Sequence, residues 1–170
     1  TTRLSLAGRY CVLMPNTNKG GGVSRKIFDV NLRKKLKDIL SSLNIKSGMG
    51  VIIRTAGQSM KKTDISRDYK ALLKLWSQIT SKTIKSTAPS LIHEEGNLLK
   101  RSIRDYFSSD LNKVIVNNKR SFKTAKDIMK FFMPGFTKFI TLEDDNTKSS
   151  LFSSEKIETQ INQMHKPVVK

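Results

Sequence analysis

The most informative segment of this chain is an apolar strand bordered by glycines, which reads Gly48-Met49-Gly50-Val51-Ile52-Ile53-Arg54-Thr55-Ala56-Gly57. At the end of the strand, Arg54 and Thr55 place a guanidinium and a hydroxyl side by side. An arginine is planar, permanently charged and able to bond two oxygens of one phosphate. A neighbouring hydroxyl and a backbone N–H exposed by glycine can complete such a receptor. The segment therefore predicts a phosphate-binding site, and the alternative is an arginine that simply reaches solvent.

The charge of the chain is strongly positive and unevenly distributed. The net charge is +18 over 170 residues. Residues 1–90 contain 18 Lys or Arg against 4 Asp or Glu, whereas residues 91–170 contain 14 against 10. A polyanionic partner is therefore expected mainly on the first half. Nucleic acid is favoured over an anionic membrane, because the chain shows no apolar run of membrane-spanning length and no signal peptide. Because 23 of the 32 basic residues are Lys, part of the charge can also reflect only a solvated surface.

Cysteine and histidine usage argues against disulfide and metal chemistry. Cys11 is the single cysteine and lies in an apolar strand, so we interpret it as a small core residue in a reducing, cytoplasmic setting. His93 and His165 are far apart and lack nearby ligand spacing. We expect no metal and no cofactor in this chain.

Apolar periodicity predicts alternating strands and helices in the first half. The helix near 64–81 is the best signalled, with Thr63 as its N-cap and Trp76 on its core-facing stripe. The expected elements are a strand at 9–14, a flexible glycine hairpin at 20–22, a helix at 31–43, a strand at 50–54, the helix at 64–81 and a loop at 80–88.

The second half continues the alternation. Its expected elements are a strand at 90–93, a helix at 97–107, a strand at 113–116, a helix at 121–132, a strand at 137–142 and a helix at 154–164. Strands separated by amphipathic helices indicate a mixed α/β (α+β) fold, with partly parallel pairing among the later strands. We place a domain boundary near residue 90.

No catalytic constellation is evident. The carboxylate pairs Glu94-Glu95 and Asp144-Asp145 are adjacent in sequence, and neighbours in a strand point to opposite faces while those in a turn face water. Asp105 follows Arg104 on a helix, which predicts a structural ion pair. We therefore assign no catalytic residue.

Several spaced blocks of the sequence resemble the bacterial ribonuclease E/G family. They are Ser5-Leu6-Ala7-Gly8-Arg9-Tyr10 through Val12-Leu13-Met14-Pro15-Asn16, Gly21-Gly22-Val23-Ser24-Arg25-Lys26, the Gly48–Gly57 segment, Arg67-Asp68 through Leu75-Trp76, Ala88-Pro89-Ser90-Leu91-Ile92-His93-Glu94-Glu95, and Arg104-Asp105-Tyr106. The blocks occur in register over most of the chain. Within the family, the resemblance leans to the E-type.

The resemblance implies an internal fragment of a single-strand-specific endoribonuclease of RNA processing and decay. Residues 1–90 would form a 5′-sensor subdomain that prefers RNA with a 5′-monophosphate, and residues 91–170 a ribonuclease-H-like structural subdomain. Arg54 would hold the phosphate with two bonds and Thr55 would add its hydroxyl and backbone. Gly8 and Val12 would line the pocket for the first nucleotide. Arg25 and Lys26 would make secondary RNA contacts, with Lys26 standing where a second arginine occurs.

The resemblance also implies what this chain lacks. The family's catalytic Mg²⁺-binding aspartates lie in a later DNase-I-like subdomain, its zinc-link cysteines lie further on, and its tetramer contacts and any membrane association belong to the full-length enzyme. We thus expect this chain to bind 5′-phosphorylated RNA and to cleave nothing alone. Two alternatives stay open: a nonspecific RNA-binding or ribosome-associated basic protein, and an independent nuclease using Glu94, Glu95 or Asp144.

Overall fold

The chain forms two compact units. The computed structural model describes residues 3–18, 21–108, 110–143 and 150–166. The units are Thr1–Phe107 and Ser108–Lys170, and both combine helices with strands, which confirms the mixed α/β class. Residues 91–107 belong to the first compact unit. The functional subdivision at residue 90 stays a prediction.

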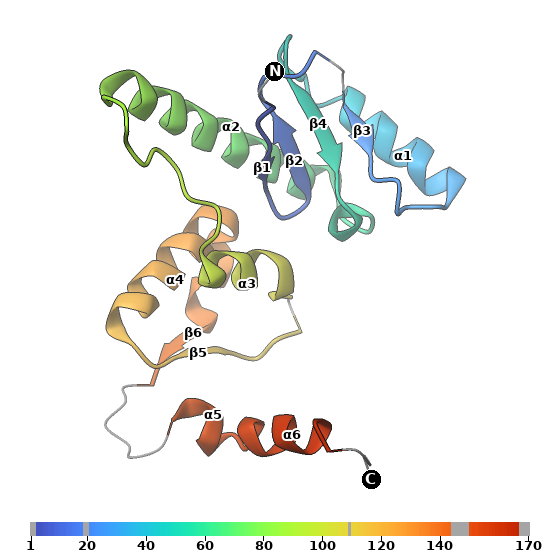
Figure 1. Cartoon of the computed structure of the whole chain (residues 1–170). Helices are drawn as coiled ribbons and strands as arrows, with labels where there is room; N and C mark the ends of the chain where they lie inside the picture. The colour runs from blue at the N-terminus through green and yellow to red at the C-terminus, as the bar shows by residue number, and fades with distance from the viewer. Residues whose placement is uncertain (1–2, 19–20, 109, 144–149, 167–170) are drawn as a thin grey trace. The chain divides into compact units, whose positions relative to one another are not determined.

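A four-stranded sheet forms the centre of the first unit (Figure 1). Its spatial order is β1 (Leu6–Ala7), β2 (Cys11–Met14), β4 (Gly50–Ile53) and β3 (Gly22–Val23). β2 runs antiparallel to β1 and β4, whereas β3 runs parallel to β4. The expected hairpin at 20–22 is therefore wrong for the described part, because β3 pairs with β4 and not with β2.

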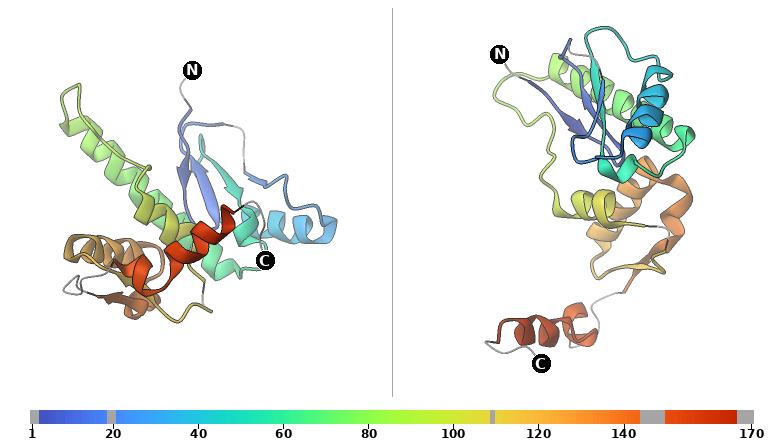
Figure 2. Two further views of the ribbon diagram at one scale, coloured as in Figure 1. Left: turned by 60° about the horizontal axis from the view of Figure 1, so that its bottom comes forward. Right: turned by 90° about the vertical axis from the view of Figure 1, so that its right-hand side faces the viewer.

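Two helices cover one face of this sheet (Figure 2). α1 (Val30–Ser41) packs on β3 and β4, and α2 (Lys62–Lys85) packs on β1 and β2. Strand residues alternate between the faces: Cys11, Leu13, Val51 and Ile53 are fully buried with Leu36 of α1 and Leu72 of α2. Among the alternate strand positions, Gly50 is buried and the others are only half-buried. None of the described helices of this unit covers that opposite face of the sheet.

The last helix of the first unit is fastened to the β1–β2 region. α3 (Leu98–Tyr106) is capped by the Asn97 side chain and buries Ile103, with Phe107 just beyond its end. Arg104 donates to the Ala7 carbonyl at 3.3 Å, and the Arg9 guanidinium donates to the Phe107 carbonyl. These contacts bring residues near 105 to the end of strand β4, where Arg54 lies.

The second unit is a strand–helix–strand arrangement. β5 (Val114–Val116) and β6 (Ile140–Leu142) pair in parallel, as the alternating pattern predicted. α4 (Lys119–Phe132) and the 3₁₀ segment η2 (Pro134–Phe139) connect them. Ala125, Met129 and Ile140 form its core. α5 (Leu151–Ser154) and α6 (Ile157–Met164) follow and contain no buried residue.

Three sequence expectations fail around α2. The helix begins after Lys61, so Thr63 is an interior residue and not the N-cap. It also continues through 80–85, where a loop was expected. There the Thr80 and Thr83 hydroxyls donate to carbonyls one turn back in the helix and do not compete with it as loop-forming groups. The strand expected at 90–93 is absent: this described segment has no strand partner, and Lys82 takes two of its carbonyls.

Candidate nucleic-acid interface

Three segments that are distant in sequence meet at one end of the strands in the first unit's sheet, where β4 leads into Arg54. We call this end of the sheet the Arg54 edge. The β1–β2 turn reaches this edge because Cys11 pairs with Ile53 in antiparallel register. The segment after β3 reaches it because Val23 pairs with Ile53 in parallel, and the Ser24 N–H donates to the Ile53 carbonyl at 2.9 Å. The edge therefore gathers five of the predicted site residues, namely Gly8, Arg25, Lys26, Arg54 and Thr55. Val12 lies just inside the edge, one position along β2.

The guanidinium of Arg54 is held on one side by the protein itself. Its Nη1 atom donates to the Gly8 carbonyl at 2.6 Å and to Asp105 Oδ1 at 2.8 Å, with a longer contact of 3.4 Å to the Arg9 carbonyl. The side chain keeps 29 % of its surface exposed. Across the described residues, Nε and Nη2 of Arg54 have no hydrogen-bond acceptor. The Nε–Nη2 edge is thus the half of the fork that can bind a ligand.

Gly8 acts in this geometry through its backbone. A Cβ atom at position 8 would lie 2.5 Å from Asp68 Oδ2, which leaves no room for a side chain. Gly8 is buried, its N–H donates to the Cys11 carbonyl at 2.8 Å, and its own carbonyl accepts from Arg54. Its contact with the arginine is one that the sequence did not predict.

The buried carboxylate of Asp68 organises the β1–β2 turn from α2. It accepts hydrogen bonds from three successive backbone N–H groups, those of Arg9 at 3.1 Å and of Tyr10 and Cys11 at 2.8 Å. Burial raises the pKa of the Asp68 carboxyl, while the three N–H groups and the nearby Arg54 charge pull that pKa down. The same burial, with the Asp68 charge, raises the pKa of the Cys11 thiol. Cys11 is fully buried, as expected.

Sequence reasoning assigned no role to Asp68, although a signal for it exists. Asp68 follows Ile65 by three positions and precedes Leu72 by four, so it lies on the apolar stripe of the predicted helix. A carboxylate on that stripe is buried and needs donors.

An ionic network extends from Arg54 into α3. Asp105 receives the Arg104 side chain through both oxygens, with Nε–Oδ1 at 3.1 Å and Nη2–Oδ2 at 2.9 Å, which confirms the predicted ion pair. The Arg104 hydrogen bonds, then those of Arg54, hold the pKa of Asp105 below its usual range. Arg104 also donates to Glu95, which binds Lys100 Nζ at 2.9 Å. Asp105 is therefore ionised at neutral pH and fixed on both sides by arginines.

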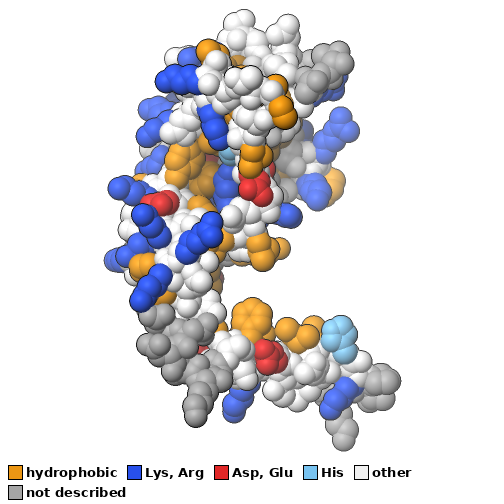
Figure 3. Space-filling model, turned by 60° about the vertical axis from the view of Figure 1, so that its left-hand side comes forward, with side chains coloured by type: hydrophobic (Ala, Val, Ile, Leu, Met, Phe, Trp, Pro, Cys, Tyr) orange, Lys and Arg blue, Asp and Glu red, His pale blue; other side chains and the backbone are white. Residues whose placement is uncertain are grey.

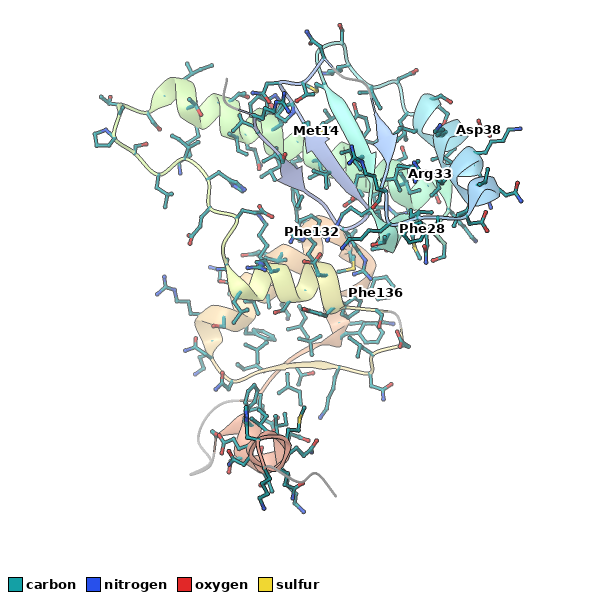
Figure 4. All side chains as sticks on the ribbon, turned by 45° about the vertical axis from the view of Figure 1, so that its right-hand side comes forward. Met14, Phe28, Arg33, Asp38, Phe132 and Phe136 are labelled. Carbon is teal, nitrogen blue, oxygen red and sulfur yellow. The ribbon has the colours of Figure 1, made fainter. Side chains whose placement is uncertain are left out.

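The remaining predicted residues present a polar surface beside this fork. Thr55 begins the 3₁₀ segment η1 (Thr55–Gly57) and is exposed, as are Arg25 and Lys26, while Val12 is half-buried. Arg33 of α1 fixes the loop that carries Arg25 and Lys26, by donating to the Ser24 carbonyl at 2.7 Å and the Ile27 carbonyl at 2.9 Å. Figure 4 labels Arg33 between α1 and the sheet. The loop position is thereby set by the fold.

The carboxylates considered for a nuclease site are differently placed. Glu95 is bound by basic side chains. Burial raises the pKa of Glu95, but Lys100, His93 and Arg104 outweigh burial and leave that pKa below its ordinary value. Glu94 is exposed, and Asp144 and Asp145 lie outside the described residues. Within the described ranges no three His, Cys, Asp or Glu side chains gather as a metal-binding group.

Comparison with known proteins identifies the family. The sequence profile of the Ribonuclease E/G family matches residues 5–170. The chain belongs to the ribonuclease E/G family. It is similar to ribonuclease E of Haemophilus influenzae, with 39 % identity over 95 % of this chain and 17 % of the relative, and to ribonuclease E of Escherichia coli K12, with 38 % identity over 95 % and 15 %. It is also 30 % identical to ribonuclease G of Haemophilus influenzae over 86 % of this chain and 29 % of that protein.

These family members are much longer than this chain, which spans less than a third of each of the three relatives. The ribonuclease E/G resemblance read from the motifs is confirmed, and identity is higher to these two proteins named ribonuclease E than to the ribonuclease G. The candidate interface lies inside the matched region. No described helix is both long and apolar enough to cross a membrane.

Proposed function

We propose that this chain is the part of a ribonuclease E/G endoribonuclease that binds the 5′-monophosphate end of single-stranded RNA. What supports the proposal is the half-occupied fork of Arg54. Gly8 and Asp105 fix its Nη1 side, so the Nε–Nη2 edge is oriented before any ligand arrives. A guanidinium that is already positioned loses little rotamer entropy on binding. The exposed Thr55 hydroxyl, adjacent in sequence, supplies a further donor for the same phosphate.

The charge of the site accounts for a preference among RNA ends. A terminal monophosphate offers two oxygens to the Nε–Nη2 edge, whereas a 5′-hydroxyl offers no anion to it. A triphosphate brings additional negative groups, and the ionised Asp105 stands against the other side of the same guanidinium. Repulsion between the Asp105 carboxylate and the extra phosphates would weaken binding of the triphosphate relative to the monophosphate. The rest of the basic surface adds affinity without sequence preference.

We assign RNA cleavage to the longer family proteins and not to this chain by itself. In that proposal Mg²⁺ and structural zinc, the homotetramer and cytoplasmic RNA decay are properties of the full-length enzyme. Of the carboxylates considered for a nuclease site, Glu94 is exposed and Glu95 is bound to cations, so they do not fit a Mg²⁺ site, and we derive no catalytic step from them. Incubation of the purified chain with RNA and Mg²⁺ tests this assignment, because cleavage that survives repurification contradicts it.

A titration of short RNAs that differ only at the 5′ end tests the sensor proposal. The 170-residue chain should bind the 5′-monophosphate form more tightly than the 5′-hydroxyl form. A hydrogen bond to a charged group contributes about 1.5–3 kcal/mol, so Arg54→Lys should reduce the preference by roughly one to two decades. Arg120→Lys, at an exposed position on α4, is the matched control and should leave the preference unchanged. Equal binding of both RNA ends by the unaltered chain refutes the proposal.

A second candidate function is nonspecific RNA binding, and the surface of α2 favours it. Lys62, Arg67 and Lys70 line a shallow groove of about 390 Å³ together with two hydroxyl residues. Figure 3 shows a face on which Lys and Arg far outnumber acidic side chains. This function predicts binding that weakens steeply with salt and ignores the chemistry of the 5′ end. The same titration therefore separates the two candidates.

A further inference from the structure

The sheet face without helices carries a continuous apolar row. Ala7 pairs with Val12, Val12 with Ile52, and Ile52 with Gly22, so the four positions cross all four strands side by side. Most of their neighbours in sequence, among them Leu13, Val51 and Val23, are buried on the helix-covered side, so these four positions face the other way. Each is half-buried in the described structure. A flat apolar strip thus runs from Val12, beside the Arg54 edge, to Gly22.

A groove of about 410 Å³ opens on this face. Met14, which is labelled in Figure 4, and Ile52 give it an apolar floor, and Gly21 and Gly22 form one border. Two exposed arginines, Arg3 and Arg25, also line it, and the other lining residues are Leu4, Ser5 and Thr17. Among the described residues that line it, none is acidic. The groove therefore combines an apolar surface with charge of a single sign.

We infer that this groove is a second RNA subsite, which binds a nucleotide downstream of the 5′ end. A nucleobase has an apolar face that can lie on the Met14–Ile52 floor, and its phosphate suits a guanidinium fork. A polyanion matches its two arginines. The direction in which the RNA strand runs, with its 5′ phosphate at Arg54 and later nucleotides in the groove, rests on the proposed function.

Gly22 offers a way to fill the groove without disturbing the fold. A Cβ atom added at Gly22 meets no atom within 4 Å, and its φ lies outside the left-handed region. Gly22→Val should therefore be accepted by strand β3, where β-branched residues are favoured, while its methyl groups enter the groove. Gly135→Val, at another position with open space, is the matched control.

The test is the affinity of the full chain for 5′-monophosphorylated RNAs of one, two and three nucleotides. Affinity should rise when the second or third nucleotide is added. Gly22→Val should remove about tenfold of that rise and leave the preference for 5′-monophosphate over 5′-hydroxyl unchanged. Gly135→Val should change neither. The double variant Arg3→Ala/Arg25→Ala provides an independent measurement, because it should lower the salt slope of binding by about 0.7 for each lost phosphate contact.

The outcomes separate this inference from the sensor proposal. If the unaltered chain ignores the 5′ end but Gly22→Val still weakens binding of longer RNAs, the sensor fails and the groove stands. If Gly22→Val and the double arginine variant both bind every RNA as the unaltered chain does, the subsite is refuted. A change of association state in Gly22→Val, with RNA affinity intact, also refutes it and identifies a protein-binding surface.

Discussion

A methyl group at position 8 would collide with the carboxylate that holds the β1–β2 turn together. In Gly8→Ala the new Cβ would lie 2.5 Å from Asp68 Oδ2 and 2.9 Å from Oδ1 and Cγ. The carboxylate cannot simply move aside, because it accepts from the N–H groups of Arg9, Tyr10 and Cys11 and is buried on α2. The variant must therefore lengthen or lose some of these three bonds.

The expected cost follows from the number and kind of these bonds. A hydrogen bond to a charged group contributes about 1.5–3 kcal/mol, and an unsatisfied buried donor costs a comparable amount. Loss of one of the three places the destabilisation of Gly8→Ala at about 1.5–3 kcal/mol. Small domains have free energies of unfolding of about 5–15 kcal/mol, so the variant is expected to fold and to be measurably weaker.

Trp76 makes the assay specific to the first unit. It is the single tryptophan of the chain and packs on α2 against the core of that unit. Urea unfolding of the full chain, followed by its fluorescence, should show a lower midpoint with an unchanged slope. Gly22→Ala is the matched control in the same sheet, because its Cβ meets nothing within 4 Å. It should change the free energy of unfolding by less than about 1 kcal/mol.

A double-mutant cycle with Asp68→Ala isolates the cause. Removing the carboxylate is itself destabilising, but it also removes the atoms with which the Gly8→Ala methyl group collides. The two changes should therefore be strongly non-additive, with Gly8→Ala costing little in the Asp68→Ala background. Additive effects, or a stability of Gly8→Ala equal to that of Gly22→Ala, refute this account of the turn.

Three further predictions concern the charges around the fork and the buried thiol. Asp105→Asn keeps a hydrogen-bond acceptor for Arg54 but removes the negative charge. In a competition assay, the variant should therefore bind 5′-triphosphorylated RNA better, relative to 5′-monophosphorylated RNA, than the unaltered chain does. An unchanged ratio of the two affinities counts against the electrostatic role of Asp105. The pKa values of Asp105 and Glu95 are lowered in the folded chain. The stabilisation that these carboxylates provide is therefore complete above the ordinary carboxyl pKa of about 4 and is lost as pH falls through the folded pKa values. When stabilities are normalised at pH 7, acid unfolding should begin at higher pH in the unaltered chain than in an Asp105→Asn variant, which lacks one of these carboxylates. Burial raises the pKa of Cys11, so alkylation of the native thiol by iodoacetamide at pH 8 should be much slower than in urea, and rapid native labelling contradicts the buried placement.

Periodicity predicted most elements because it follows directly from burial. Leu36 and Leu40 of α1, and Ile65, Tyr69 and Leu72 of α2, repeat at helical spacing and are buried. The errors occur where local signals compete with context. Thr63 resembles an N-cap, and the Ser/Thr-rich 80–85 stretch resembles a loop, yet the hydroxyls of the latter bond within the helix. Residues 90–93 have strand composition, but a strand exists only when a neighbour pairs with it.

The family, the positive charge of the first half and the residues that gather at the Arg54 edge could all be predicted from the composition, spacing and order of motifs in the sequence. These properties depend on residue type and local periodicity, which a chain carries before it folds. Folding alone set the state of Arg54, because its partners Gly8 and Asp105 lie 46 and 51 positions away. Asp68 likewise gained its role from donors 57 to 59 positions distant. Contacts of such separation depend on strand register and helix docking, and no local pattern encodes either of these.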